Sequence, residues 1–450
     1  MRRLVIPLLG ALAGCHACPV DVGGEVEAQA AAVAPARATL EWLPCAAEDP
    51  APPEPVDLPA LWNLALANNP ALREAAADVE AARGRLIQAG KYPNPKVAYT
   101  EAEIGTSQNA AGDLTVEINQ EIVTAGKRGL DVAIAARGTD VASLALLAGK
   151  FDVLTRLRRA YYDYLAWRYA VEVNADVLAA LQKGVDITRK QVEEVKVRPR
   201  ADLVRLQAVL EEARITRDRS RISLEAAWRQ LAAEVGLPDL QMAEAGRDWN
   251  DPVPQWDAAA VVGRVLAANT ALKQAAVEAE QARLEVERAQ AEAVPNVTVG
   301  GGYSRNFAEN ERGAIVSVET ALPLWDRKQG HVHEAQARLA KAQAAQRTAE
   351  LRLRRDTAEA FGRYLAARQQ VERLNKEVLP RLVESLSLVR QSYQAGGAQV
   401  TFADVLLAEQ TLNDARLRLA DVRRELWRAV ADLQGLMQLD VDEEVAVPRP

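Results

Sequence analysis

Hydrophobic and polar residues alternate in two short segments, one in each half of the chain. In LTVEINQEI, which begins at Leu114, the apolar residues fall on one face of an extended segment and most polar residues fall on the other. The second half repeats this alternation around Val316 and Val318. Pairing with the segments that begin at Lys96 and Asn296 predicts two β-hairpins. The connecting loops are expected near residues 105–112 and 306–313.

These predicted strands have the length and alternation of strands that cross a membrane, which is roughly nine to eleven residues with one apolar face. A soluble hairpin that caps a helical bundle would show the same alternation, so the strands alone leave both interpretations open. After the N-terminus, no segment reaches the roughly 18 uninterrupted apolar residues of a membrane helix. The best run, VASLALLA from Val141, is much shorter. Any membrane-spanning structure is therefore expected to consist of strands.

Long helical stretches separate the predicted hairpins. Residues 130–196 contain no proline, and residues 331–394 contain only Pro380. At a rise of 1.5 Å per residue, each stretch would form a helix roughly 100 Å long. Each long helix is followed by a turn and a returning helix, expected over about 201–235 and 401–436. Shorter helical segments, over about 58–91 and 259–293, precede the hairpins and end at a Pro-Asn pair.

The same order of segments occurs twice. LANNPALREAAADVEAARGRL from Leu66 aligns with LAANTALKQAAVEAEQARLEV from Leu266, and the Pro-Asn pair recurs at Pro93 and Pro295. AYYDYLA matches AFGRYLA further along, and AWRQLAAEVG matches LWRAVADLQG. Four matches in one order indicate an internal duplication. The predicted division is a signal peptide over 1–14, a tail or linker over 15–57, repeats over 58–257 and 258–439, and a C-terminal tail over 440–450.

Two hairpins supply too few strands to close a barrel. An open strand edge in lipid would leave backbone groups unsatisfied, at several kcal/mol each. Three copies would supply twelve strands, enough for a wide pore. The predicted fold class is therefore mainly α with a membrane β-barrel contribution. In this fold, a protomer of long helical hairpins carries two β-hairpins and closes as a trimer with a 12-stranded barrel.

The N-terminus resembles that of a bacterial lipoprotein. Arg2 and Arg3 precede an apolar run that ends in LAGC, so the run is predicted to be a secretion signal. Cleavage within LAGC would leave Cys15 as a lipidated first residue, whereas ordinary signal cleavage would leave it a thiol. The second position is not the Asp that favours inner-membrane retention, so the outer membrane is the expected location. Cys18 and Cys45 then remain as a possible disulfide pair.

Composition and motifs exclude several function classes. The net charge is -7, and the sequence contains no cluster of Lys and Arg residues of the kind that binds nucleic acid, so nucleic-acid binding is not expected. Hydrolase, zinc-protease, P-loop and dinucleotide-binding motifs are missing, and there are three histidines, so neither an enzyme nor a cofactor is predicted. His331 and His333 do not share a helix face and have no cluster of further ligands at suitable spacing. We therefore expect no metal site there.

Three segments carry a family resemblance: NNPALREAAADVEAARGRLIQAGKYPNP, QEIVTAGKRG and its counterpart TALPLWDRKQG. Together with the duplicated hairpins, they resemble the TolC-like outer-membrane efflux proteins over about residues 58–439. The order PNP, QEI, GKRG is most similar to the CzcC-type branch, which serves cobalt, zinc, cadmium and related heavy-metal pumps. AGKRG stands here in place of the commoner GGKRG.

The resemblance implies a homotrimeric duct with a barrel in the outer membrane and a helical tunnel across the periplasm. It implies three further partners: a periplasmic adaptor, an inner-membrane resistance-nodulation-division pump, and outer-membrane lipid. Heavy-metal cations are the expected substrate. A drug-efflux or type I secretion duct of the same fold stays open as an alternative. A periplasmic adaptor or coiled-coil scaffold is the rival from another class, although such a protein would not carry a duplicated hairpin unit.

The resemblance also implies where function resides. The turns after the two long helices are expected to meet the adaptor and close the channel; they contain Arg198, Pro199, Arg200, Asp202, Gly396, Gly397 and Asp404. Asp202 and Asp404 would contribute a polar ring or inter-helix pairs, or would simply favour the helix N-termini electrostatically. Glu117, Glu121 and Glu319 are expected to face the lumen, where carboxylates favour cations.

Overall fold

The computed structural model describes residues 57–102, 112–194, 199–243, 253–307, 309–394 and 400–441. All of them belong to the compact unit Ala46–Pro450. Helices make up 75% of the described residues and are joined by a few antiparallel strands, which confirms the expected mainly-α class. Cys15, Cys18, Cys45, Arg198, Gly396 and Gly397 lie outside the described residues.

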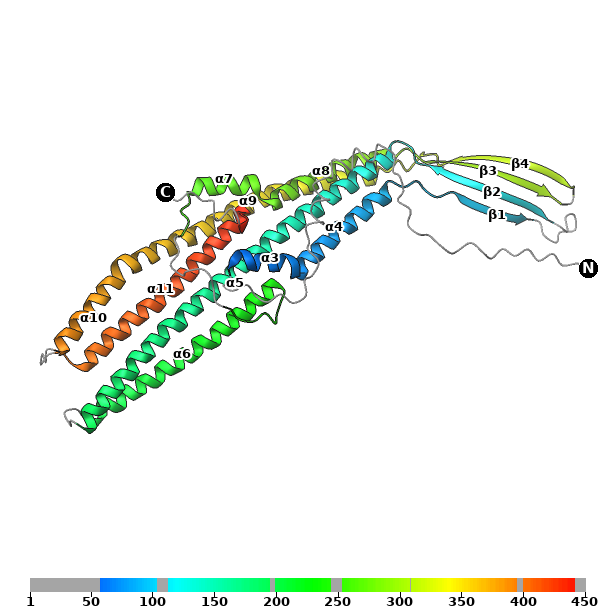
Figure 1. The fold of residues 1–450 in the computed structure, drawn as a ribbon. Helices are drawn as coiled ribbons and strands as arrows, with labels where there is room; N and C mark the ends of the chain where they lie inside the picture. The colour runs from blue at the N-terminus through cyan, green and yellow to red at the C-terminus, as the bar shows by residue number, and fades with distance from the viewer. Residues whose placement is uncertain are drawn as a thin grey trace, which may run out of the picture. The chain divides into compact units, whose positions relative to one another are not determined.

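The elements follow the duplicated order (Figure 1). The first repeat contains α3 (Leu58–Asn68), α4 (Pro70–Ala89), β1 (Lys96–Ala102), β2 (Asp113–Ile122), α5 (Lys127–Glu193) and α6 (Arg200–Val235). The second contains α7 (Ala258–Ala268), α8 (Thr270–Ala291), β3 (Val297–Asn306), β4 (Glu311–Thr320), α9 (Gln329–Arg373), a π-helical turn η1 (Leu374–Val378), α10 (Leu379–Gln394) and α11 (Phe402–Met437).

The expectation of one helix before each hairpin is wrong, because each divides at an asparagine. The Asn69 side chain accepts a hydrogen bond from the Ala71 N–H and caps α4. Asn269 caps α8 in the same way. The side-chain amides of both asparagines also donate to carbonyls near the ends of the returning helices, at 2.7 Å to Glu234 and 3.1 Å to Leu436. The duplication has therefore preserved a tertiary contact as well as a sequence motif.

The long helix expected over 331–394 is interrupted as well. A π-helical turn separates α9 from α10, and the Leu379 N–H bonds to the Leu374 carbonyl. Pro380 explains this locally, because it has no N–H and its ring displaces the carbonyl one turn earlier. By contrast, α5 runs unbroken for 67 residues.

The four strands form one antiparallel sheet in the order β1-β2-β3-β4. Both expected hairpins are present, and β2 joins them by pairing with β3 from Asp113↔Asn306 to Ile122↔Val297. The connection between β3 and β4 is shorter than the expected loop over 306–313, because the ladder continues to the Asn306↔Glu311 pair. Most of the other loop, near 105–112, lies outside the described residues.

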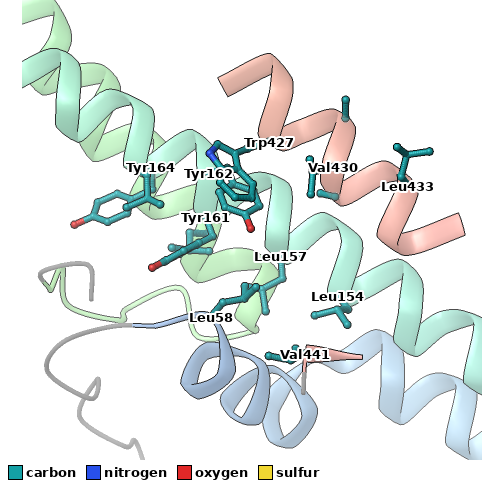
Figure 2. Packing of buried hydrophobic residues seen from close by; sticks show 14 of the residues in the cluster. Leu58, Leu154, Leu157, Tyr161, Tyr162, Tyr164, Trp427, Val430, Leu433 and Val441 are labelled. Atoms are coloured by element: carbon teal, nitrogen blue, oxygen red, sulfur yellow. The ribbon is translucent and has the colours of Figure 1, made fainter. Parts of the chain in front are cut away.

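The main hydrophobic core is centred on α5 and α11 (Figure 2). Tyr162 stacks on Trp427 with ring centroids 4.8 Å apart, and Tyr164 meets Trp228 edge-on at 5.1 Å. The Tyr164 hydroxyl donates to the Ala243 carbonyl at 2.7 Å, so its buried polar group is satisfied. These tyrosines come from AYYDYLA, one of the duplicated segments, which is therefore a core motif.

Among the described residues, α5 is the one helix long and apolar enough to cross a membrane by length and composition. Its most apolar 18-residue window has a mean hydropathy of 1.4, and 11% of that window is buried. α5 packs against α4, α6, α8 and α11. These contacts make it part of the helical framework.

Candidate functional site

The four-stranded sheet has one face that is apolar and exposed. Val97 and Tyr99 on β1, Ile118 on β2, and Val316 and Val318 on β4 share this face by register. Val316 is 83% exposed and Val97 is 71% exposed. A contiguous exposed surface of this kind marks a site of contact with lipid or with another protein.

The opposite face is polar and carries the three predicted acids. Glu117 lies opposite Gly302, and Thr298 lies between Glu121 on β2 and Glu319 on β4. Glu117 and Glu121 are half-buried and Glu319 is exposed. The register therefore brings the three carboxylates onto one face of one sheet.

Two glycines on β3 accommodate the side chains of that polar face. A Cβ atom on Gly300 would overlap the Asn119 side chain and the Ser317 hydroxyl. A Cβ atom on Gly302 would lie 2.5 Å from the Val116 carbonyl oxygen. Because no side chain projects from Gly300, Asn119 can lie against the sheet, where its carbonyl oxygen is 3.5 Å from the Ser317 hydroxyl.

A polar cluster joins the sheet to the helices at the neck, which we define as residues 90–94, 121–131 and 294–296. The Lys127 ammonium donates to the Val294 carbonyl at 2.5 Å and to the Asn296 side-chain oxygen at 2.7 Å. The Asn296 amide in turn donates to Glu121 at 2.6 Å, and the Thr124 hydroxyl donates to a neighbouring carbonyl. Desolvation lowers the pKa of Lys127, and the nearby Arg288 guanidinium lowers it further.

Arg128 ties the other Pro-Asn turn to the same helix start. Its guanidinium lies 3.7 Å from the centroid of the Tyr92 ring and donates to the Gly90 carbonyl at 3.2 Å. Consecutive residues of the GKRG motif thus bind the second Pro-Asn turn and the residues that lead into the first. This role of Lys127 and Arg128 was not predicted, although the GKRG motif and the repeated Pro-Asn pair are both visible in the sequence.

The corresponding segment of the second repeat is much more exposed. Leu322 is 73% exposed and Trp325 is 86% exposed. Lys328 has a φ of 61° at the N-cap of α9, and its ammonium pairs with Asp326 at 3.0 Å. Lys328 thus pairs with a residue of its own loop, whereas Lys127 in the first repeat binds a turn of the second repeat.

The described parts of the predicted tips lie at the starts of the returning helices. Pro199 is the N-cap of α6, Arg200 begins that helix and Asp202 is in its first turn. Asp404 forms a capping box at the start of α11, accepting from both the N–H and the hydroxyl of Thr401 at 2.7 Å. Both hydrogen bonds lower the pKa of Asp404, and the bond from the Thr401 hydroxyl has the larger effect.

The two histidines considered as a metal site lie near the start of α9. His331 Nδ1 lies 3.9 Å from a carboxylate oxygen of Glu334. Within the part of the chain that the structure describes, His, Cys, Asp and Glu residues form no group of three or more that could hold a metal ion.

Comparison with known proteins gives a consistent result. A sequence profile of outer membrane efflux proteins matches residues 61–237 and again 261–437. The chain is 26% identical over 392 residues to the cobalt-zinc-cadmium resistance protein CzcC of Cupriavidus metallidurans, covering 85% of this chain and 90% of that one. It is also 26% identical over 392 residues to protein CyaE of Bordetella pertussis, covering 77% of this chain and 80% of the other.

A solved structure shows the same fold. The outer membrane protein VceC of Vibrio cholerae aligns with a TM-score of 0.70 at 21% identity, covering 84% of this chain and 95% of that one. The efflux profile covers most of the chain and matches once in each repeat, which decides against an adaptor, a scaffold or an enzyme. The chain therefore belongs to the outer membrane efflux protein family and is an outer-membrane efflux channel component.

Proposed function

We propose that three copies of this chain form the duct of a tripartite resistance-nodulation-division efflux system that exports heavy-metal cations. The observation that carries the proposal is the sheet, which has an exposed apolar face and a polar face with Glu117, Glu121 and Glu319. In a closed barrel, the apolar face would contact lipid and the polar face would line the pore. The name of the CzcC relative supports the choice of metal cations.

The carboxylates give the duct its proposed preference for cations. Three copies of each acid would place rings of negative charge in the pore, and such rings favour cations over anions. A duct also has to release its substrate, so weak, distributed attraction suits it better than a tight metal site. The choice between metals would then be made by the pump.

The partners are proposed to meet the chain at the helical tips. A periplasmic adaptor would bind around Pro199, Arg200, Asp202 and Asp404, and would connect the duct to the inner-membrane pump. The capping box at Asp404 supports a structural role for that acid. A gating role would require additional contacts between copies.

The N-terminal features remain proposals. Cys15 would carry the lipid that anchors the mature chain in the outer membrane, and Cys18 and Cys45 would form a disulfide. The mass of the mature N-terminal peptide, measured before and after reduction, tests both. An unmodified Cys15 would refute the anchor, and free Cys18 and Cys45 thiols before reduction would refute the disulfide.

Metal resistance tests the substrate. Cells that lack this gene should become more sensitive to cobalt, zinc or cadmium, and a plasmid copy should restore growth. A copy with Glu117→Gln, Glu121→Gln and Glu319→Gln should restore it only in part, provided that an immunoblot shows equal amounts in the outer membrane. Sensitivity to drugs alone, with unchanged metal tolerance, would overturn the metal proposal in favour of a drug-efflux duct.

A planar-bilayer recording tests the charge argument separately. The purified channel should be cation-selective, and the triple glutamine variant should shift its reversal potential toward zero. Anion selectivity in the unaltered channel would contradict the proposed lumenal position of these acids.

A further inference from the structure

Two arginines lie directly opposite one another at the end of the sheet that points away from the helices (Figure 1). Arg305 on β3 pairs with Arg312 on β4, one residue pair before the turn that joins the two strands. Like charges that face each other in an antiparallel pair destabilise it. The pair would therefore be stabilised by a bound negative charge.

The register places both arginines on the apolar face of the sheet. Arg305 and Tyr303 are two residues apart in β3, so their side chains share a face. Tyr303 lies opposite Val116, which lies opposite Tyr99 on that apolar face. Because Arg312 pairs with Arg305, it lies on the same face. The arginines therefore form the row of side chains that follows the row of these tyrosines.

The two tyrosines indicate the depth at which the arginines lie. Tyr303 is 43% exposed and Tyr99 is 65% exposed. Aromatic side chains form a girdle where the apolar band of an outer-membrane barrel meets the lipid headgroups. The helical part of such channels lies in the periplasm, and the arginine row is one step further from the helices than the tyrosines. Both guanidinium groups are thus placed at the level of the headgroups of the outer leaflet.

Acidic side chains do not neutralise the pair within the part of the chain that the structure describes. No acid of these residues forms an ion pair with either arginine. Glu101 shares the apolar face but lies two strands from Arg305, which is roughly 10 Å at the usual strand spacing. Glu311 pairs with Asn306 and lies on the polar face. The counter-charge would therefore have to come from a ligand.

The side chain of Arg305 is held in place and has an unused donor. Its Cζ atom lies 4.8 Å from the centroid of the Phe307 ring. Its Nε atom is buried and has no hydrogen-bond acceptor among the described residues. A buried donor without an acceptor is costly, so this N–H group indicates a ligand that supplies oxygen atoms.

We propose that Arg305 and Arg312 bind the phosphate of a lipid headgroup in the outer leaflet of the outer membrane. A phosphate has enough oxygen atoms to accept hydrogen bonds from two guanidinium groups, and arginine matches its geometry well. The acyl chains of the lipid would then lie along the exposed apolar face of the sheet. This inference rests on the proposed duct, because it requires the sheet to face lipid.

Reversing one charge tests the site. Arg312→Glu replaces a like-charge pair with an opposite-charge pair, so the hairpin should no longer need an anion. In the full-length complex, extracted in detergent and stripped of lipid, hydrogen–deuterium exchange in β3 and β4 should be slower in this variant than in the unaltered protein. Adding diphosphorylated lipid A should slow exchange in the unaltered protein and have no effect on Arg312→Glu.

Two milder variants keep the test valid if the charge reversal disturbs folding. Arg312→Gln should weaken binding of lipid A about tenfold, because it removes one charged donor group. Arg305→Lys keeps the charge but loses the planar fork, so it should weaken binding as well. Lys96→Gln is the matched control, since Lys96 is an exposed cation on the polar face at the other end of the sheet. It should bind lipid A like the unaltered protein.

The outcomes separate the site from the duct. If Arg312→Glu and Arg312→Gln bind lipid A as well as a trimeric unaltered protein does, the headgroup site is overturned and the duct proposal survives. If inorganic phosphate slows exchange in β3 and β4 as much as lipid A does, the pair binds a free anion, and the lipid proposal is overturned. A monomer outside the outer membrane would instead overturn the proposed duct.

Discussion

The two helical hairpins share one topology but differ in how they are held together. α5 is continuous and packs against α6 through a separate hydrophobic cluster, which contains Leu181, Val185, Leu203, Leu206 and Leu210. A buried hydrogen bond of 2.9 Å from Asn174 to Ser220 joins the same two helices. In the second repeat, the π-helical turn interrupts the long helix. α10 and α11 bury Leu386, Val405 and Leu412, and a surface ion pair between Arg390 and Glu409 joins the two helices.

The duplication therefore conserved the path of the chain more strictly than the contacts that hold each hairpin together. Apolar burial and a buried hydrogen bond are not screened by simple salts such as NaCl, whereas a surface ion pair contributes little and is screened. Opening free energies vary within one protein according to such local packing. We therefore expect the α10–α11 tip to separate more easily than the α5–α6 tip.

The largest expected effect comes from the apolar cluster of the first tip. Leu206 is 1% exposed, and Leu206→Ala should cost about 2–5 kcal/mol of local opening free energy, because it leaves a cavity. Hydrogen–deuterium exchange of α5 and α6 measures this. Val204→Ala on the same helix is the matched control, since Val204 is exposed, and it should change exchange little. Equal effects would contradict the role of the cluster.

Moving the proline between the two long helices tests whether Pro380 causes the π-helical turn. Ala180 occupies the position in α5 that Pro380 has after the π-helical turn, at the offset of 200 seen in AYYDYLA and AFGRYLA. Ala180→Pro should weaken the first hairpin by about 3 kcal/mol, and Pro380→Ala should strengthen the second by up to that amount. Exchange rates near both positions report the change. Unchanged exchange around 374–378 in Pro380→Ala would show that proline does not cause the turn.

The polar contacts should differ in the same direction but by less. Asn174→Ala leaves a buried hydroxyl short of one partner, and should cost about 1–3 kcal/mol. Arg390→Ala removes a largely exposed ion pair, and should cost about 0.2–1 kcal/mol. Raising the NaCl concentration should speed exchange in α10 and α11 of the unaltered protein more than in α5 and α6, whose ion pairs Arg189–Asp186 and Arg214–Glu211 each lie within one helix. An equal or larger salt effect at the first tip would contradict this distinction.

The smallest expected effect is the loss of the Asp404 cap of α11 at acidic pH. Hydrogen bonds from Thr401 lower the folded-state pKa of Asp404 from 3.8, so its carboxylate stabilises α11 above that pH. The contribution should disappear as the pH falls through the lowered folded-state value. The protection factor at the first turn of α11, which is the intrinsic exchange rate divided by the observed rate at the same pH, should therefore fall in acid. Asp404→Asn should show the lower protection factor already at neutral pH. If the first turn of the Asp404→Asn variant showed the same pH dependence as the unaltered protein, another titrating group would be responsible.

Hydrophobic periodicity predicted the helices, the hairpins and the duplication, because the helical and strand periods differ in the sequence itself. It missed the breaks at Asn69 and Asn269, although the Asn-Pro pair at the first is a recognisable cap signal. It also missed the π-helical turn, since a single proline does not specify how a helix accommodates it. The gating or lumenal roles of the predicted acids remain predictions.

The sequence by itself determined the fold class, the family and the two faces of each strand, because these depend on local pattern and on repetition along one chain. Only the tertiary structure decided that β2 pairs with β3, since contacts between residues nearly 200 positions apart leave no local periodicity. It also revealed that Lys127 binds the second Pro-Asn turn and that Arg128 binds the residues just before the first. A positive side chain selects its partner through geometry and burial, and these exist only after the helices and strands have packed.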